Sequence, residues 1–242
     1  MGLIKAISEF FAKYLFNSKW RCVNCGKEIF KDEYFCEKCK NQLPFNDKSY
    51  CQHCGRKLKI SREYCTTCKG RITHVDKERS VYNYEKPINL LIQRLKYNNR
   101  LYLAEPFAKD MANVYYKNYF NADAVTYIPM TYNAFRKRGY NQSEELAKEF
   151  CKATGLELIE CLDKVKETSR QATLNRTERQ SNLKSAFRVI NRKLVRGRKI
   201  LIIDDVSTTG ATAEIVAERL KRAKAKAVFL LTIASVPPKD GY

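Results

Sequence analysis

The stretch ILIIDDVSTTGAT, residues 200–212, runs from four apolar residues through two carboxylates into small and hydroxyl-bearing residues. A continuous apolar run of this kind predicts a strand that is buried on both faces, as in a parallel sheet. An amphipathic helix is expected to follow directly, over residues 212–225. In parallel sheets, ligands bind beyond the carboxyl ends of the strands. The sequence therefore predicts a binding site where this strand ends.

The residues on either side of this stretch alternate between helical and extended patterns. Helices are expected at 86–97, 101–120 (broken or started near Pro106) and 142–156, with Gly155 as a C-cap. Further strands are expected at 80–85, 122–130, 158–165, 187–190 and 226–234, and residues 166–187 indicate a long polar loop with a short helix. Alternating helices and apolar strands predict an α/β fold with a mostly parallel sheet flanked by helices.

The residues after the strand have the character of a phosphate site. Backbone amides at a helix N-terminus bind a phosphate, and a glycine lets the backbone turn tightly. Carboxylates repel a phosphate but suit sugar hydroxyls or a metal ion. The pattern therefore predicts a ligand with a phosphate at one end and vicinal hydroxyls nearby, such as ribose 5-phosphate. The residues concerned are Asp204, Asp205, Ser207, Thr208, Thr209, Gly210, Ala211 and Thr212.

An ATPase is the main rival interpretation, because apolar residues followed by two acids also resemble a Walker B strand. The chain has no G-x-x-x-x-G-K-[ST] sequence to accompany such a strand. A plain strand-to-helix turn with an Asp cap would explain one acid but not two acids followed by a cluster of hydroxyls. We therefore favour the sugar-phosphate site.

Eight of the ten cysteines fall into two identical C-x2-C-x10-C-x2-C frames. Paired C-x2-C knuckles present four thiolates in the tetrahedral arrangement that zinc prefers. A redox C-x-x-C would be expected once, near a βαβ unit, rather than four times in register. Two structural Zn²⁺ ions are expected, and pairing within each frame is favoured over crossing between frames, which stays open. The ligands are Cys22, Cys25, Cys36 and Cys39 in the first frame and Cys51, Cys54, Cys65 and Cys68 in the second.

Charge and hydropathy bear on partners and location. The chain has 46 Lys and Arg residues against 26 Asp and Glu, for a formal net charge of +20. This excess favours phosphate-bearing partners, although a solvated basic surface explains it equally well. Residues 1–19 predict an amphipathic helix in which charged residues interrupt the apolar face, so neither a transmembrane segment nor an export signal is expected. The expected location is the cytoplasm.

Together these motifs resemble a known family. ILIIDDVSTTGAT resembles the signature with which type I phosphoribosyltransferases bind phosphoribosyl pyrophosphate (PRPP). With RKRGYNQSEELA at 136–147, RQATLNRTERQSNLKSAF at 170–187 and the paired cysteines upstream, the chain resembles the ComF family of bacterial competence-associated proteins. The expected domains are the helix at 1–19, a double zinc ribbon at 20–72 and a phosphoribosyltransferase-like domain at 80–236.

The resemblance implies a role for each matched position. The two acids would bind the ribose hydroxyls of PRPP, and Thr208–Thr212 would surround its 5-phosphate. A loop after Met130 would hold the pyrophosphate with Mg²⁺, and a mobile loop at 168–180 would close over the site. The pyrophosphate-side candidates are Arg136, Arg138 and Asn141, and the loop candidates for catalysis are Arg170, Gln171 and Arg179.

One departure from the family class concerns the acceptor. Hypoxanthine-type enzymes have an Asp base where this chain has Thr208, so purine salvage is not expected. The leading hypothesis is a ComF-like protein that binds PRPP and Mg²⁺ and assists the handling of single-stranded DNA in natural transformation, with other competence proteins as partners. The alternatives are a phosphoribosyltransferase that acts on an unknown small acceptor and a PRPP-sensing regulatory module.

Overall fold

The structure is a computed structural model that describes residues 20–237 except 31–32, 48, 59–61 and 167–184. The helix expected at 1–19 lies outside the described residues. The chain divides into two compact units, Met1–Leu43 and Pro44–Tyr242, and each is described by itself. The first cysteine frame belongs to the smaller unit and the second to the larger one.

The larger unit is built on a four-stranded parallel sheet. The strand order is β1-β6-β5-β2, so the strand that carries the acid pair, β5, lies inside the sheet. Asp204 is level with Thr232 of β6, and Ile203 is level with Tyr127 at the end of β2. The strands are β1 (Lys77–Asn83), β2 (Ala124–Tyr127), β5 (Lys199–Ser207) and β6 (Ala227–Ser235).

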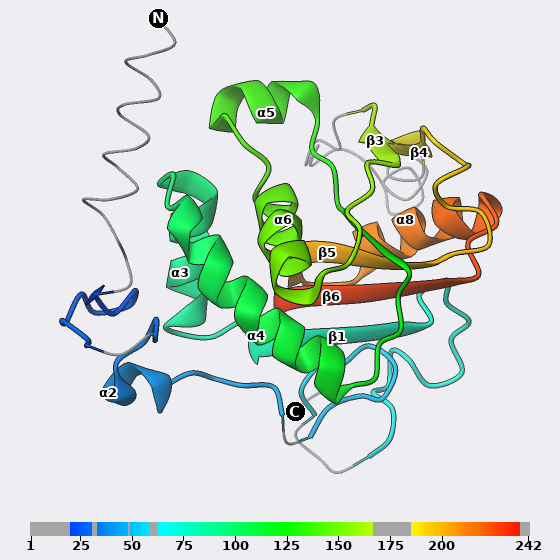
Figure 1. Ribbon diagram of the computed structural model, residues 1–242. Helices are drawn as coiled ribbons and strands as arrows, with labels where there is room; N and C mark the ends of the chain where they lie inside the picture. Colours follow the sequence, from blue (N-terminus) through cyan, green and yellow to red (C-terminus); the bar gives the residue numbers. More distant parts are fainter. Residues whose placement is uncertain (1–19, 31–32, 48, 59–61, 167–184, 238–242) are drawn as a thin grey trace, which may run out of the picture. The chain divides into compact units, whose positions relative to one another are not determined.

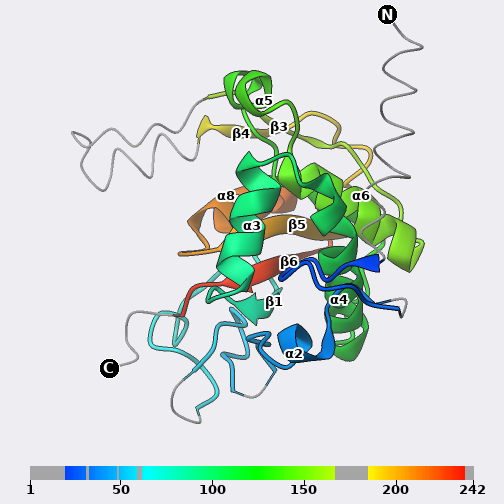
Figure 2. The same ribbon diagram turned by 90° about the vertical axis from the view of Figure 1, so that its left-hand side faces the viewer.

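Helices cover both faces of this sheet. Figures 1 and 2 show α4 (Ala104–Lys117) and α6 (Gln142–Thr154) on one face and α8 (Ala211–Arg222) on the other. The remaining elements are α3 (Ile88–Tyr97), the short 3₁₀ helix η2 (Leu101–Leu103), α5 (Tyr132–Arg138) and an antiparallel pair of strands, β3 (Leu162–Lys164) and β4 (Phe187–Val189). The expected α/β architecture with a mostly parallel sheet is confirmed.

The apolar run that precedes the acids forms the centre of the core. Residues 200–203 of β5 are completely buried, because neighbouring strands flank β5 and helices cover both faces of the sheet. Ile200 and Ile202 pack into a cluster with Val216 and Leu220 of α8. Side chains alternate between the faces of a strand, so Leu201 and Ile203 point to the opposite face. Burial on both faces fixes the point at which the strand leaves the core, and hence the position of Asp204.

The second cysteine frame packs along the free edge of β1. Phe45 pairs with Tyr82 in an isolated antiparallel bridge, and the Glu78 backbone N–H donates to the carbonyl of His53 at 3.2 Å. Gly55 approaches β1 so closely that a Cβ atom at this position would lie 2.6 Å from the Glu78 carbonyl oxygen. Backbone contact of this kind makes the second frame part of the larger unit.

In the smaller unit, the described residues of the first cysteine frame form their own small ribbon. Arg21 and Glu28 pair in an antiparallel bridge, and the Cys22 N–H donates to the carbonyl of Lys27 at 2.8 Å. A single-turn helix, α2 (Glu37–Lys40), carries Cys39. A segment this small buries little apolar surface of its own, so metal binding is expected to supply much of its folding free energy.

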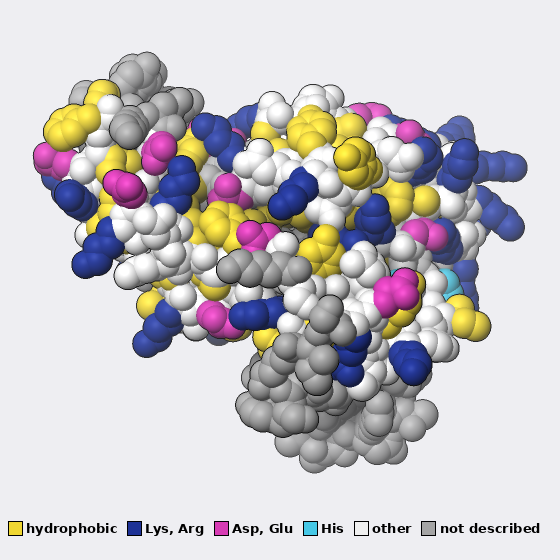
Figure 3. Space-filling model, turned by 90° about the horizontal axis from the view of Figure 1, so that it is seen from below, with side chains coloured by type: hydrophobic (Ala, Val, Ile, Leu, Met, Phe, Trp, Pro, Cys, Tyr) yellow, Lys and Arg dark blue, Asp and Glu magenta, His cyan; other side chains and the backbone are white. Residues whose placement is uncertain are grey.

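The surface charge and the helix lengths bear on partners. Figure 3 shows one face of the molecule, on which Lys and Arg side chains are spread among hydrophobic and uncharged ones rather than gathered into one stripe. The excess of positive charge therefore does not by itself mark a binding surface on this face. Within the described ranges, no helix is both long and apolar enough to cross a bilayer.

Candidate functional site: the acid pair and the phosphate loop

The two carboxylates of β5 are held by side chains from two helices. Asp204 accepts a hydrogen bond of 2.8 Å from the Ser143 hydroxyl of α6. Asp205 is 4% exposed, forms an ion pair of 2.9 Å with Lys96 of α3 and accepts a hydrogen bond of 2.8 Å from the Gln142 amide. Gln142 and Ser143 are consecutive residues in the first turn of α6, so the start of this helix contacts both acids. The pair is thus anchored rather than free in solvent.

The environment opposes the negative charge of Asp204. Burial of its carboxyl and the neighbouring charge of Asp205 raise its pKa to about 7, against the hydrogen bonds from the Asp205 N–H and Ser143 and the attraction of Lys96. For Lys96, burial disfavours the charged form, but the attraction and hydrogen bond of Asp205 and the attraction of Asp204 outweigh it and raise its pKa. A bound cation at the acid pair would relieve the repulsion between the carboxylates.

The loop after the acids leads directly into α8. Gly210 is the N-cap residue of α8, adopts a left-handed conformation with φ of 75°, and offers no side chain to cap the helix. The Ala211 N–H donates to the Thr209 hydroxyl at 3.3 Å, and the other first-turn amides, which have no partner within the helix, are available to an anion. The Ser207 hydroxyl is used within the protein, because it donates to the Glu78 carboxylate of β1. The loop borders a cavity of about 50 Å³ lined by Asp204, Val206, Ser207, Thr208, Thr209, Gly210, Ala211, Thr212, Ala213, Leu230 and Thr232.

The residues expected on the pyrophosphate side are found on a helix rather than in a loop. Thr131 caps α5 by accepting from the Ala134 N–H at 3.3 Å, and Gly139 ends the helix with φ of 84°. The expectation of a loop after Met130 is therefore wrong for Arg136 and Arg138. Three charged residues follow the adjacent apolar positions Ala134 and Phe135, so the segment has no amphipathic pattern from which the helix could be recognised.

The three pyrophosphate-side candidates have different environments. Arg138 donates to the side-chain oxygen of Gln142, the residue that also contacts Asp205, so it is connected to the acid pair. Arg136 is exposed on α5. Asn141 is 4% exposed; its amide donates to the Ile128 carbonyl at 3.0 Å while its oxygen caps α6. Both ends of the Asn141 side chain are engaged in the fold. The loop candidates Arg170, Gln171 and Arg179 lie outside the described residues.

Sequence reasoning missed three residues that contact the acids: Lys96, Gln142 and Ser143. The last two lie within the quoted stretch RKRGYNQSEELA, directly after the cap residue Asn141, so their place in the first turn of α6 is a signal that the sequence contains. Lys96 lies on α3, more than a hundred residues before Asp204, and has no local pattern that distinguishes it from other surface lysines.

Exposed aromatic side chains and exposed or half-buried basic ones lie beside the acid pair, on α3 and α5. We call this set the aromatic–basic surface. The Arg138 guanidinium lies 5.2 Å from the centre of the Tyr97 ring, and that of Arg136 lies 5.9 Å from the Tyr132 ring. Tyr97 is 70% and Tyr132 is 72% exposed. A hollow of about 250 Å³ adjoins Tyr97 and Arg94. The surface comprises Arg94, Tyr97, Tyr132, Phe135, Arg136 and Arg138.

The eight paired cysteines form two tetrads, each within one frame. In each tetrad the four Sγ atoms lie within 4.8 Å of one another, as tetrahedral zinc coordination requires. The ligands therefore pair within frames and do not cross between them. In the second tetrad, the Cys65 N–H donates to the Cys51 sulfur at 3.3 Å, which is typical of a knuckle that stabilises thiolates. Structural zinc is what this donor set is suited to hold.

Comparisons with protein families match both parts of the chain. A double zinc ribbon domain family matches residues 12–69, and a phosphoribosyl transferase domain family matches residues 103–240, more than half of the chain. These matches confirm that the chain contains the expected zinc ribbons and a phosphoribosyltransferase-like domain.

Curated relatives cover the same region. Competence protein F of Haemophilus influenzae is 28% identical over 61% of this chain and 67% of its own length. The DNA utilization protein YhgH of Escherichia coli K12 is 30% identical over 62% of this chain and 67% of its own length. Competence protein ComFC of Streptococcus pneumoniae is 31% identical over 62% of this chain and 64% of its own length. The match spans about two thirds of the length of these relatives.

Solved structures with a similar fold are more distant. Glutamine PRPP amidotransferase from B. subtilis is 18% identical, with a TM-score of 0.43 over 58% of this chain and 30% of that chain. A structure of the allosteric regulatory enzyme of purine biosynthesis is 19% identical, with a TM-score of 0.39 over 54% of this chain and 26% of that chain. Similarity at this level carries no inference about ligands.

Proposed function

Because the chain belongs to the ComF family of competence-associated proteins, with a double zinc ribbon and a phosphoribosyl transferase domain, we propose that it binds PRPP with Mg²⁺ and holds single-stranded DNA beside that site. The observation that carries the PRPP proposal is the acid pair at the end of β5. It adjoins a loop that opens α8 without a side-chain cap. A sugar phosphate carries hydroxyls, which suit the acids, and a phosphate, which suits the start of the helix.

Each part of the ligand has a complementary group in the site. The 5-phosphate is assigned to the loop Thr208–Thr212 and the first-turn amides of α8, where a helix N-terminus favours an anion. The ribose hydroxyls are assigned to Asp204 and Asp205, which are acceptors when ionised. Arg138 extends from the same network and is the described residue best connected to receive the pyrophosphate.

Magnesium has a defined role in this arrangement. Mg²⁺ binds oxygen ligands, retains several waters and typically bridges one or two carboxylates to phosphate oxygens. It would supply charge to offset both the carboxylates and the pyrophosphate. Displacement of Lys96 from Asp205 would free a carboxylate oxygen for the hydroxyls or the hydrated ion.

The PRPP proposal is tested by titrating PRPP into the protein with and without Mg²⁺. Binding should be measurable with Mg²⁺, weaken strongly without it, and be competed by ribose 5-phosphate and by pyrophosphate separately, since each occupies one half of the site. Binding that is unaffected by ribose 5-phosphate would contradict the assignment of the phosphate loop.

Single-stranded DNA is assigned to the aromatic–basic surface. Base stacking on exposed aromatic rings with arginines for the backbone is how proteins bind single strands without strong sequence preference. The surface is connected to the acid pair through Arg138 and through Tyr97, which follows Lys96 in α3. Affinity for an oligonucleotide should fall steeply as salt rises, because phosphate contacts release counterions. Binding that is absent, or that is insensitive to salt, would contradict this assignment.

A phosphoribosyltransferase acting on a small acceptor is the second candidate, and the anchored acid pair favours it. An oxocarbenium-like centre that forms as pyrophosphate leaves would be stabilised by nearby carboxylates. Thr208 is exposed and provides no base, so the acceptor would have to be a nucleophile that needs none at this position. Release of pyrophosphate from PRPP should then be stimulated by one class of base, amine or nucleoside. If no acceptor stimulates release while PRPP still binds, this candidate is excluded.

A further inference from the structure

A buried arginine of the second zinc ribbon is not explained by the ribbon itself. Arg56 is 6% exposed. Its Nε atom is buried with no hydrogen-bond partner, and its charge acts to lower the pKa of the buried Glu78 carboxyl, against the larger effect of burial. Arginine is almost never buried without a partner, because removing a guanidinium from water is costly. The attraction of the buried Glu78 carboxyl offsets part of this cost, but the buried Nε–H donor is left without an acceptor, which a bound anion could supply.

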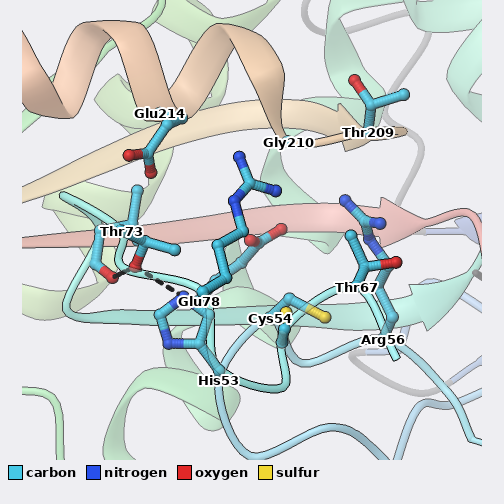
Figure 4. Close-up of a pocket in the computed structure, with 12 residues that line it drawn as sticks. His53, Cys54, Arg56, Thr67, Thr73, Glu78, Thr209, Gly210 and Glu214 are labelled. Carbon is cyan, nitrogen blue, oxygen red and sulfur yellow. Dashed lines mark hydrogen bonds between the residues drawn. The ribbon is translucent and has the colours of Figure 1, made fainter. Parts of the chain in front are cut away.

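The guanidinium of Arg56 lies against the phosphate loop. A Cβ atom added to Gly210 would lie 3.3 Å from Arg56 Nη2, so the side chain reaches the N-cap residue of α8. Figure 4 shows Arg56 extending from the ribbon toward the segment that carries Thr209 and Gly210. The cavity between ribbon and loop is only about 30 Å³, too small for a nucleotide. Arg56 lines this cavity, whereas Thr209 and Gly210 line both it and the cavity of the phosphate loop, so Arg56 would approach a ligand at the loop from the ribbon side.

Glu78 of β1 also contacts the phosphate loop. Its carboxylate accepts the Ser207 hydroxyl, and its Oε2 would lie 3.9 Å from a Cβ atom at Gly210. Glu78 is 6% exposed and comes from β1, the strand to which the ribbon is attached. The phosphate loop thus rests on a strand side chain and a ribbon side chain, both buried.

The cysteine tetrad fixes the backbone of Arg56. The Cys51 N–H donates to the Arg56 carbonyl at 2.9 Å, and the Arg56 N–H interacts with the Cys54 sulfur. Arg56 therefore directly follows a knuckle whose sulfurs are suited to zinc. The position of the guanidinium depends on the geometry of that knuckle.

We propose that Arg56 of the second zinc ribbon is a binding residue for the 5-phosphate of the ligand, which makes the zinc site and the phosphate loop one coupled unit. This inference rests on the proposed binding of PRPP. It assigns to the ribbon a part in recognising a sugar phosphate, and the ligand class is any ribose 5-phosphate derivative. The pyrophosphate lies at the other end of the site and is independent of Arg56.

The test compares Arg56→Met with Lys57→Met. Both variants remove one positive charge from adjacent residues of the ribbon, and both positions follow the zinc ligand Cys54 within three residues. The Lys57 side chain is exposed, however, whereas that of Arg56 is buried. Calorimetric titrations use PRPP, ribose 5-phosphate and pyrophosphate. Arg56→Met should bind the two 5-phosphate ligands roughly 10- to 100-fold more weakly, as expected for a lost charge-assisted hydrogen bond, with pyrophosphate affinity unchanged. Lys57→Met should bind all three as the wild type does, and Arg56→Lys should be intermediate.

A second measurement uses the wild-type protein and needs no variant to fold. Zinc release to a chromogenic chelator is followed in the presence of saturating ribose 5-phosphate or pyrophosphate. Because coupling between two sites is reciprocal, ribose 5-phosphate should slow the release of one of the two zinc equivalents several-fold, and pyrophosphate should not.

The results separate this inference from the proposed function. If wild-type protein binds neither PRPP nor ribose 5-phosphate, the proposed function fails and the inference fails with it. If it binds both and Arg56→Met binds them equally well, or if ribose 5-phosphate leaves both zinc equivalents equally labile, only the assignment of Arg56 is overturned.

Discussion

At the scale of one residue, Asp204 shows that the site destabilises the folded protein when no ligand is bound. The pKa of its carboxyl is raised to about 7, above its ordinary value, by burial and by Asp205. The unfolded chain therefore releases this proton at lower pH than the folded protein does. The free energy of unfolding that this carboxyl contributes is therefore largest at low pH, where it is protonated in both states, and falls as pH rises from about 4 to about 7. Such strain is expected where a site awaits a cation or hydroxyl ligand.

The Asp204→Asn variant tests this effect, because an amide resembles the neutral acid in shape and does not titrate. The free energy of unfolding of the variant, relative to wild type, should rise from about pH 4 to about pH 7 by on the order of 1–3 kcal/mol and then level off. Denaturant titrations at several pH values measure the difference. Zinc thiolates titrate equally in both proteins, so their contribution cancels. Stability curves that run parallel at all pH values would contradict the raised pKa.

The residues that the sequence could identify are those that lie in one continuous stretch. The acid pair and the phosphate loop follow one another in β5 and α8, so local pattern and chemistry were sufficient to select them. Lys96 reaches Asp205 only because α3 packs beside the carboxyl ends of the strands, a tertiary arrangement with no local signal. The sequence also contains no local signal for Arg56, because the repeat of cysteines does not indicate which ribbon contacts the sheet.

At the scale of elements, the two ribbons share a sequence frame but not an environment. Gly26 and Gly55 occupy the same position of the frame, with φ of 76° and 63°. A Cβ atom at Gly26 would meet nothing within 4 Å, whereas one at Gly55 would lie 2.9 Å from Arg79 Cα and closer still to a carbonyl. The docking of the second ribbon on β1 therefore depends on a glycine for space as well as for conformation.

This contrast predicts different effects for the same substitution. Gly26→Ala should lower the stability of the first ribbon by about 1 kcal/mol, the usual cost of a positive φ for alanine. Gly55→Ala adds a backbone clash and should lower the stability of the larger unit by roughly 2 kcal/mol or more. Thermal unfolding of each variant, with zinc content measured in parallel, makes the comparison. Equal effects at the two positions would show that the second ribbon is not packed on β1.

The aromatic–basic surface is a second element-scale feature, formed by α3 and α5. Tyr97→Ala and Tyr132→Ala should each weaken binding of a single-stranded oligonucleotide by about 1–3 kcal/mol, the range found for loss of base stacking. Tyr119→Ala is the matched control, because Tyr119 is 88% exposed but lies beyond the end of α4. Fluorescence anisotropy with a labelled oligonucleotide measures all three. An equal loss in the control would indicate that no specific surface is involved.

Most elements were predictable because their apolar residues recur with a helical or extended period. Helix α6 runs from Gln142 to Thr154 with Gly155 as its C-cap, as the pattern indicated, whereas the Asn141 cap at its start was not predicted. Helix α5 was not predictable, because none of its residues is buried and its boundaries come from the Thr131 cap and Gly139 rather than from a hydrophobic face. The pairing order of the strands also requires tertiary information.

At the scale of the whole molecule, the two tetrads belong to separate compact units. Cys22→Ser/Cys25→Ser should remove one zinc per chain and leave the thermal transition of the α/β domain unchanged. Cys51→Ser/Cys54→Ser should also remove one zinc but lower that transition, because the second ribbon is bonded to the edge of β1. Zinc analysis with differential scanning calorimetry distinguishes the two. A transition that is equally lowered by both variants would contradict the division into units.

The central claim is that the acid pair of β5 binds PRPP together with Mg²⁺. Its most direct test is calorimetric titration of PRPP and Mg²⁺ into the wild type and into Asp204→Asn/Asp205→Asn. The amides preserve shape but remove the charges that accept the ribose hydroxyls and attract the cation. We expect saturable binding to the wild type and at least roughly 100-fold weaker binding to the variant, for the loss of two charge-assisted contacts. Equal affinity for the two proteins would contradict the account.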